Sequence, residues 1–212
     1  MGLHSAELTG VLLAGGKSRR MGRDKRFVEL DGHTLLDRTL SVYERLFSEI
    51  LVIVAEPVLQ LSGSSYRIVT DLIPDRGSLG GLYTGLFYAT HQRAFVAACD
   101  MPFLNADVIK RMTELDHKAD VVMVRLANGL QPMHAIYSKA CLPLLKKMID
   151  AEALKIQTLV HTPELLIRLV TEKDLRDVDP QLLSFVNVNS PADLEFARKL
   201  VRQQRGMAGG EQ

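Results

Sequence analysis

From residue 12 to residue 25 the chain reads Leu12-Leu13-Ala14-Gly15-Gly16-Lys17-Ser18-Arg19-Arg20-Met21-Gly22-Arg23-Asp24-Lys25. An apolar strand here runs into a loop that carries glycines and closely spaced cationic side chains. Glycine lets the backbone turn sharply and bring bare N–H groups against phosphate oxygens, and the cations neutralise charge that backbone dipoles alone cannot. The stretch predicts a phosphate-binding loop at the end of a strand. The alternative is a surface loop whose basic residues are only solvated.

Neither of the two commonest phosphate-binding motifs fits this loop. A P-loop requires Gly-x-x-x-x-Gly-Lys-Ser/Thr, and a dinucleotide fingerprint requires Gly-x-Gly-x-x-Gly at the start of a helix. Neither spacing can be laid over residues 15 to 25. The loop therefore points to another kind of phosphate site.

The rest of the chain alternates short apolar runs with amphipathic stretches. The apolar runs lack a polar face, as strands of a covered parallel sheet do, and they occur at residues 10–14, 50–55, 67–69, 94–98 and 121–124, with a further strand at 165–170. Helices are predicted at 34–47, 79–90, 105–117 and 138–149, with a helical stretch at 153–161 and a last helix opened by Ser190. This alternation predicts an α/β fold: a doubly wound, Rossmann-like, mostly parallel sheet with helices on both faces. We expect a single domain over residues 1–205 and a disordered tail over 206–212.

Composition and charge narrow the class of protein. A hydrophobic content of 47% over 212 residues is enough to bury a core. Lys and Arg number 26 against 25 for Asp and Glu, so the net charge of +1 gives no reason to expect nucleic-acid or membrane binding. Cys99 and Cys141 form no disulfide framework or metal cluster, and we find no signal-peptide pattern or apolar run of membrane-spanning length, so we expect a cytoplasmic protein.

Three predicted strands end in residues suited to a ligand site. Gly15, Asp71 and Asp100 each follow such a strand, and ligands of doubly wound sheets bind beyond the carboxyl ends of the strands. Asp100 leaves its strand directly before Met101-Pro102, and its carboxylate suits Mg²⁺, which takes hard oxygen ligands. Each acid also has a structural alternative: Asp100 as a helix-capping residue, and Asp71 as a turn-forming residue.

The ordered string Leu-Ala-Gly-Gly-x-Ser-Arg-Arg-Met-Gly-x-Asp-Lys resembles the signature of the nucleotidyltransferases, and most closely that of the molybdenum cofactor guanylyltransferases. The segments around Asp100 and Asn187 resemble the same family, which has a nucleotide-diphospho-sugar transferase-like fold. The resemblance implies catalytic roles for Arg19, Lys25 and Asp100, with Mg²⁺ on Asp100. It implies GTP binding by Leu13, Ala14, Gly15, Gly16, Gly22, Lys25, Asp71, Gly77, Gly81 and Asp100, and molybdopterin binding by Asn187 and Asn189.

Three segments either depart from the family pattern or allow a second interpretation. The family usually has Gly-Pro-Leu-Ala-Gly where this chain has Gly77-Ser78-Leu79-Gly80-Gly81, which puts the rigidity of that loop in doubt. Asn187 and Asn189 are expected to point the same way on an extended strand, where two amides can read a pterin edge. The alternative is that they organise the turn into the last helix. His134 falls in a region that the family uses near the pterin, although a lone histidine is more often structural.

The resemblance implies a reaction and two substrates. The terminal phosphate of Mo-molybdopterin would attack the α-phosphorus of GTP, giving molybdopterin guanine dinucleotide and pyrophosphate. Proteins that deliver molybdopterin, and molybdoenzymes that accept the product, are expected partners. The alternatives are a nucleotidyltransferase that uses CTP on molybdopterin or a nucleotide on a sugar phosphate, and a non-enzymatic carrier of pterin or nucleotide.

Overall fold

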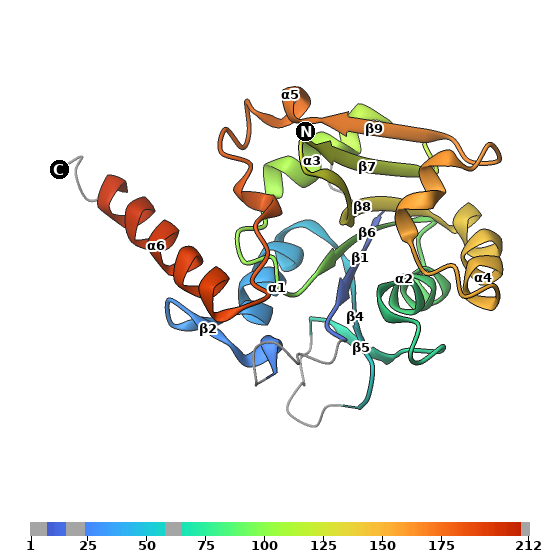
Figure 1. The fold of residues 1–212 in the computed structure, drawn as a ribbon, viewed down its shortest axis with the longest axis horizontal. Coiled ribbons are helices and arrows are strands. Elements are labelled where there is room, and N and C mark those ends of the chain that lie inside the picture. The colour runs from blue at the N-terminus through green and yellow to red at the C-terminus, as the bar shows by residue number, and fades with distance from the viewer. Residues whose placement is uncertain (1–7, 16–23, 58–64, 209–212) are drawn as a thin grey trace.

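The computed structural model describes residues 8–15, 24–57 and 65–208, which form a sheet with helices on both of its faces (Figure 1). Within these residues one seven-stranded sheet has the order β5-β4-β1-β6-β8-β7-β9. Among the described strands of this sheet, β8 is the one that runs antiparallel to its neighbours. The strands are β1 (Leu8–Leu13), β4 (Glu49–Val54), β5 (Arg67–Thr70), β6 (Arg93–Ala98), β7 (Val121–Leu126), β8 (Gly129–Ser138) and β9 (Ile167–Thr171). The prediction of a doubly wound, mostly parallel sheet is confirmed.

Two apolar cores cover the two faces of the sheet. One core packs α1 (Leu35–Leu46), α3 (Ala106–Leu115) and α5 (Glu172–Leu175) against it. The other core packs α2 (Gly77–Tyr88) and α4 (Leu142–Asp150) on the opposite face. In α1 a capping box joins Thr34 and Asp37, which starts the helix where the prediction of a helix at 34–47 places it. Gly85 lets α2 lie close to β1, because a Cβ there would come within 2.4 Å of Val11.

A smaller third apolar cluster packs the C-terminal helix against a short hairpin, near the edge formed by the carboxyl ends of the parallel strands. The hairpin of β2 (Glu29–Leu30) and β3 (His33–Thr34) packs with α6 (Pro191–Ala208) through a cluster that includes Val28, Leu194 and Val201. Figure 1 shows α6 projecting from the body of the molecule. Short 3₁₀ turns complete the described chain: η1 (Lys25–Phe27), η2 (Lys139–Cys141), η3 (Ile156–His161) and η4 (Leu183–Phe185).

Three details differ from the sequence prediction. The sequence did not reveal β8, because Gln131 and Pro132 interrupt its apolar pattern and its register with β7 shifts between Met123 and Val124. The helical stretch predicted at 153–161 is the 3₁₀ turn η3. The last helix continues to Ala208 and so includes residues 206–208 of the stretch predicted as a disordered tail, whereas 209–212 lie outside the described residues. Extending an existing helix costs far less than starting one, so the weak apolar content after residue 205 does not stop it.

The described helices include none that is both long and apolar enough to cross a membrane.

Candidate active site

A pocket of about 440 Å³ lies at the carboxyl ends of β1, β4, β5 and β6. It sits where the strand order reverses between β1 and β6, which is the position at which open α/β sheets bind ligands. Its lining includes the predicted residues Leu13, Ala14, Gly15, Lys25, Asp71, Gly77, Gly81 and Asp100. Gly16, Arg19 and Gly22 lie outside the described residues.

The end of β1 forms the floor of this pocket. The Ala14 N–H donates to the Ile53 carbonyl at 2.8 Å, which ties the strand end to β4. At Gly15 a Cβ would lie 3.1 Å from the Ala55 backbone nitrogen, so the backbone at Ala55 would have to move by a few tenths of an ångström. A glycine at this position therefore keeps the start of the loop close to β4.

Asp100 follows β6 and is anchored by the C-terminal segment. Its backbone carbonyl accepts a hydrogen bond from the Val188 N–H at 2.8 Å. Its carboxylate lies 3.4 Å from the Lys25 ammonium, and only 18% of its side chain is exposed. Burial raises the pKa of Asp100 above its ordinary value, and the nearby Lys25 partly opposes that rise.

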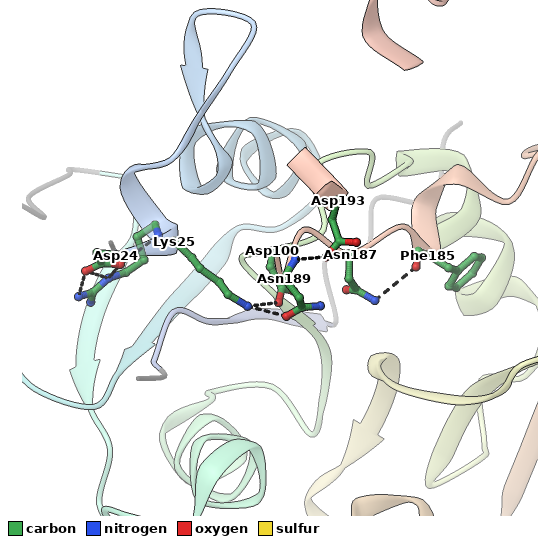
Figure 2. A network of polar contacts seen from close by, with 8 residues as sticks. Asp24, Lys25, Asp100, Phe185, Asn187, Asn189 and Asp193 are labelled. Carbon is green, nitrogen blue, oxygen red and sulfur yellow. Dashed lines mark hydrogen bonds and ion pairs between the residues drawn. The ribbon is translucent and has the colours of Figure 1, made fainter. Parts of the chain in front are cut away.

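Lys25 lies at the start of η1 and reaches across to two oxygen atoms. Its ammonium donates to Asn189 Oδ1 at 2.5 Å as well as to Asp100 Oδ2 (Figure 2). Asp24 caps η1: its carboxylate accepts from the Arg26 backbone N–H at 3.0 Å and pairs with the Arg26 guanidinium. The sequence predicted Lys25 and Asp100 as site residues, and the structure brings them together.

Asn187 and Asn189 do not form the parallel pair predicted from strand periodicity. Residues 186–189 lie outside any strand, and the two amides turn to different partners (Figure 2). Asn187 Nδ2 donates to the Phe185 carbonyl at 3.4 Å, whereas Asn189 Oδ1 accepts from Lys25. The Asn189 backbone N–H donates to the Asp193 carboxylate at 2.9 Å. Asn189 thus belongs to the Lys25 and Asp100 cluster and also helps to order the turn into α6.

Asp71 is held on the opposite wall of the pocket, between β5 and α2. Its Oδ1 accepts from the Ile73 N–H at 3.1 Å and from the Thr84 hydroxyl at 2.7 Å. The turn alternative for Asp71 is therefore realised in part, because the bond to Ile73 is an Asx turn. Sequence reasoning missed Thr84, since its only signal was a hydroxyl on the buried face of a glycine-rich helix.

The glycines of the second loop have separate physical reasons. Gly77 has a φ of +55°, which favours glycine. A Cβ at Gly80 would lie 2.7 Å from the Ile73 carbonyl oxygen and 2.9 Å from Asp71 Oδ2, so the alanine of the usual family pattern has no room here. At Gly81 a Cβ would be 3.2 Å from the Leu13 side chain. The departure at Gly80 thus accompanies a close approach of the loop to Asp71.

Neither Cys99 nor His134 is suited to nucleophilic or acid–base chemistry in this structure. Burial raises the pKa of the Cys99 thiol to about 12, so it stays protonated at neutral pH. Burial lowers the pKa of His134 to about 3, and its ring packs between Phe95 and Phe185. Among the described residues, no three His, Cys, Asp or Glu side chains are grouped to hold a metal ion. The interpretation of His134 as a structural residue agrees with this environment.

One end of the pocket holds the Gly15 strand end, the Lys25 ammonium and the Asp100 carboxylate. The other end holds the Asp71 carboxylate, which Thr84 fixes in place. Such a site can bind a phosphorylated ligand at the cation and hold a polar group of the same ligand at Asp71. Comparison with known proteins agrees with this geometry: residues 10–164 match the MobA-like NTP transferase domain. That match defines the class, a nucleotidyltransferase.

Individual relatives narrow the class to a family. The chain is 38% identical over 200 residues to the molybdenum cofactor guanylyltransferase of Desulfosudis oleivorans, covering 93% of this chain and 98% of the relative. It is 34% identical over 201 residues to a probable molybdenum cofactor guanylyltransferase of Pelotomaculum thermopropionicum, covering 94% and 96% of the two chains. A crystal structure of molybdopterin-guanine dinucleotide biosynthesis protein A from Archaeoglobus fulgidus superposes with a TM-score of 0.80 at 25% identity, covering 92% of this chain and all of the other. The chain belongs to the molybdenum cofactor guanylyltransferase family.

Proposed function

We propose that the chain transfers GMP from GTP to Mo-molybdopterin, forming molybdopterin guanine dinucleotide and releasing pyrophosphate. The name of the family describes this reaction. The relatives favour it over transfer from CTP, transfer to a sugar phosphate or a carrier role. The single observation that carries the proposal is the meeting of Lys25, Asp100 and Asn189 beside the pocket at the end of β1.

That cluster can neutralise and orient a triphosphate. The Lys25 ammonium lies 3.4 Å from Asp100 and 2.5 Å from Asn189, so its position is fixed from two sides. A cation held in advance of the reaction stabilises developing negative charge without reorganisation. We assign phosphate contacts to Lys25, Gly15, Gly16, Gly22 and Arg19. The chemical role is assigned to Lys25, Arg19 and Asp100.

The donor set near Lys25 fits Mg²⁺. Asp100 Oδ2 and Asn189 Oδ1 are hard oxygen donors that already face one cation, the Lys25 ammonium. Asp100 is the proposed metal ligand, with the Asn189 oxygen close to it. When bound, Mg²⁺ would neutralise phosphate charge at the reacting phosphorus. The attacking phosphate is already an anion, so the chain needs no strong general base, in agreement with the inert His134 and Cys99.

The other wall of the pocket is proposed to hold the nucleoside. Asp71, Gly77 and Gly81 line it together with Leu13 and Ala14. A fixed carboxylate accepts hydrogen bonds from N–H or O–H donors, and the glycines leave space for a flat base. Molybdopterin is proposed to lie toward the 187–189 segment, with Asn187 on its side and Asn189 between the two substrates.

Pyrophosphate release tests the proposal. Purified protein would be given molybdopterin, Mg²⁺ and either GTP, CTP or ATP, and a sugar phosphate would replace molybdopterin in a parallel series. We expect release with GTP and molybdopterin well above the other combinations. Ligand binding without pyrophosphate release would support the carrier, and preferential release with CTP would support a cytidylyltransferase.

Two substitutions test the assigned roles. Asp100→Ala should lower turnover by about three orders of magnitude, because losing the metal ligand forfeits several kcal/mol of charge stabilisation. Lys25→Ala should weaken GTP binding and slow turnover. Lys146→Ala is the matched control, because Lys146 pairs with Asp150 on the exposed side of α4. Folded variants of Asp100 or Lys25 that keep more than about a tenth of the parent's turnover would contradict the assignment.

The proposed setting is the cytoplasm, with proteins that deliver molybdopterin and molybdoenzymes that accept the product as partners. Cys99 and Cys141 are both unpaired and buried, which agrees with a reducing compartment.

A further inference from the structure

Thr84 stands out among the residues of α2 because its polar side chain is fully buried behind the pocket wall. The residue has no exposed surface. Its hydroxyl lies 2.7 Å from Asp71 Oδ1 and 3.0 Å from the Leu72 backbone nitrogen. A hydroxyl buried in an apolar helix face is costly unless both bonds are made, and here they are.

The direction of these two bonds is fixed by chemistry. The Leu72 N–H can only donate, so Thr84 Oγ1 accepts from it. The hydroxyl proton must therefore point to Asp71, whose carboxylate accepts it. Together with the Ile73 N–H at 3.1 Å, Oδ1 of Asp71 receives two donors from within the protein.

These bonds determine how Asp71 sits in the pocket. Its backbone N–H donates to the Val54 carbonyl at 2.8 Å, and its Oδ2 lies against Gly80, where a Cβ would come within 2.9 Å. The carboxylate is thus held at both ends while Asp71 remains part of the pocket lining. No hydrogen bond to Oδ2 is formed by the residues that the structure describes, so this oxygen is the one left to accept from a ligand.

We propose that Thr84 is a positioning residue for nucleotide binding, which orients Asp71 so that Oδ2 accepts a hydrogen bond from an N–H or O–H donor of the nucleoside. The inference rests on the proposed function, because it takes GTP as the ligand. Thr84 itself has no exposed surface, so its hydroxyl affects the nucleotide through Asp71 and not by direct contact. Guanine offers N–H donors and ribose offers hydroxyl donors, and both have the chemistry that a carboxylate accepts.

Thr84→Val is the main test, because valine keeps the shape and removes the hydroxyl. We expect the KM for GTP to rise about tenfold, within the range for a lost hydrogen bond to a charged group. We expect kcat to change by less than about threefold, because the Lys25 and Asp100 cluster is untouched. Thr84→Ser restores the hydroxyl and should return the KM to within about threefold of the parent.

A double-substitution cycle separates positioning from a general loss of structure. In the Asp71→Ala background, Thr84→Val should have little further effect on the KM, because the residue through which it acts is gone. Valine leaves the Leu72 N–H without its acceptor. If this prevents folding, Thr84→Ala is the second variant, because its smaller side chain leaves space for a water molecule that can accept from that N–H. Calorimetric titration with GTP alone gives the affinity without turnover.

The nucleoside donor is identified by analogues. Loss of discrimination between GTP and inosine triphosphate in Thr84→Val assigns Oδ2 to the base amino group, and loss of discrimination between GTP and 2′-deoxy-GTP or 3′-deoxy-GTP assigns it to a ribose hydroxyl. The inference is overturned by an unchanged KM in a folded Thr84 variant, by a fall confined to kcat, or by an undiminished effect in the Asp71→Ala background. Absence of GTP-dependent pyrophosphate release in the parent protein would instead refute the proposed function, while GTP titration would still test Thr84.

Discussion

Replacing Asn189 with alanine should impair the nucleotide reaction, although strand periodicity alone would assign this residue to the pterin. Asn189 Oδ1 accepts from the Lys25 ammonium at 2.5 Å, and this contact holds Lys25 beside Asp100. A hydrogen bond to a charged group contributes roughly 1.5 to 3 kcal/mol. If that contribution is made in the transition state, Asn189→Ala lowers kcat/KM for GTP by about ten- to a hundredfold.

Asn187→Ala is the matched control for this experiment. It removes the same amide from the same segment, but Asn187 contacts the Phe185 carbonyl and not Lys25. We expect Asn187→Ala to leave GTP kinetics near those of the parent. Any loss of affinity should concern molybdopterin. Asn189→Asp keeps an oxygen acceptor beside Lys25 and should retain more turnover than Asn189→Ala.

The assay is pyrophosphate release at saturating molybdopterin with GTP varied, together with separate calorimetric titrations of each ligand. A loss of molybdopterin affinity alone in Asn189→Ala, with GTP kinetics intact, would refute this role of Asn189. An equal effect of the two alanine variants on GTP would refute it as well, because Asn189 contacts Lys25 and Asn187 does not. Circular dichroism and thermal unfolding would show that both variants are folded, since Asn189 also donates to the Asp193 carboxylate.

Three further predictions follow from buried groups. Because burial raises the pKa of Asp100, ionisation of its carboxyl opposes folding. Asp100→Asn should therefore have a higher melting temperature than the parent at neutral pH. This difference should shrink as the pH falls through the raised pKa, because the parent's carboxyl then becomes protonated. Gly80→Ala should raise the KM for GTP and lower the melting temperature, because its Cβ would lie 2.7 Å from the Ile73 carbonyl; a gain in stability, as alanine gives in an open helix, would contradict the packing. His134 has its pKa lowered to about 3, so acid should unfold the parent as the unfolded state takes up a proton below about pH 6.5. His134→Leu removes this proton uptake. As the pH falls below about 6.5, its free energy of unfolding, measured by urea denaturation, should therefore decrease less steeply than that of the parent, by up to about 1.4 kcal/mol per pH unit. Equal pH dependences of the two proteins would refute this.

The fold could be predicted from the sequence where the apolar pattern is strong. β1, β4 and β6 are continuous apolar runs, and α1 has a capping residue and a regular apolar face, so the predicted type and order of these elements are correct. β8 could not be found in this way, because an antiparallel strand that contains Pro132 and joins two central partners has no apolar periodicity of its own. Tertiary pairing, and not local propensity, makes it a strand.

The candidate site was predicted in part for the same reason. Asp71 and Asp100 follow parallel strands, and the fold class alone places such residues at one sheet edge. The contact between Lys25 and Asn189 joins residues 164 positions apart, and no local pattern indicates it. Strand periodicity also misled at Asn187 and Asn189, because it applies only to residues that pair in a sheet, and these two do not.

Two walls of one pocket carry different tasks, and their separate construction makes this testable. One wall carries Lys25 and Asp100, with Asn189 bonded to Lys25 beside the pocket, and this cation and these oxygens suit the phosphates and the metal. The other is formed by Asp71, fixed through Thr84 and Gly80 on β5 and α2, where a neutral nucleoside edge fits. Negative charge develops on the phosphates, which are proposed to lie at the first wall, so substitutions there should lower kcat. Changes at the second wall remove binding that is equal in ground and transition states, so they should raise KM with kcat preserved. A Thr84 variant with a large fall in kcat, or a Lys25 variant with a pure rise in KM, would mean that the two walls do not act separately.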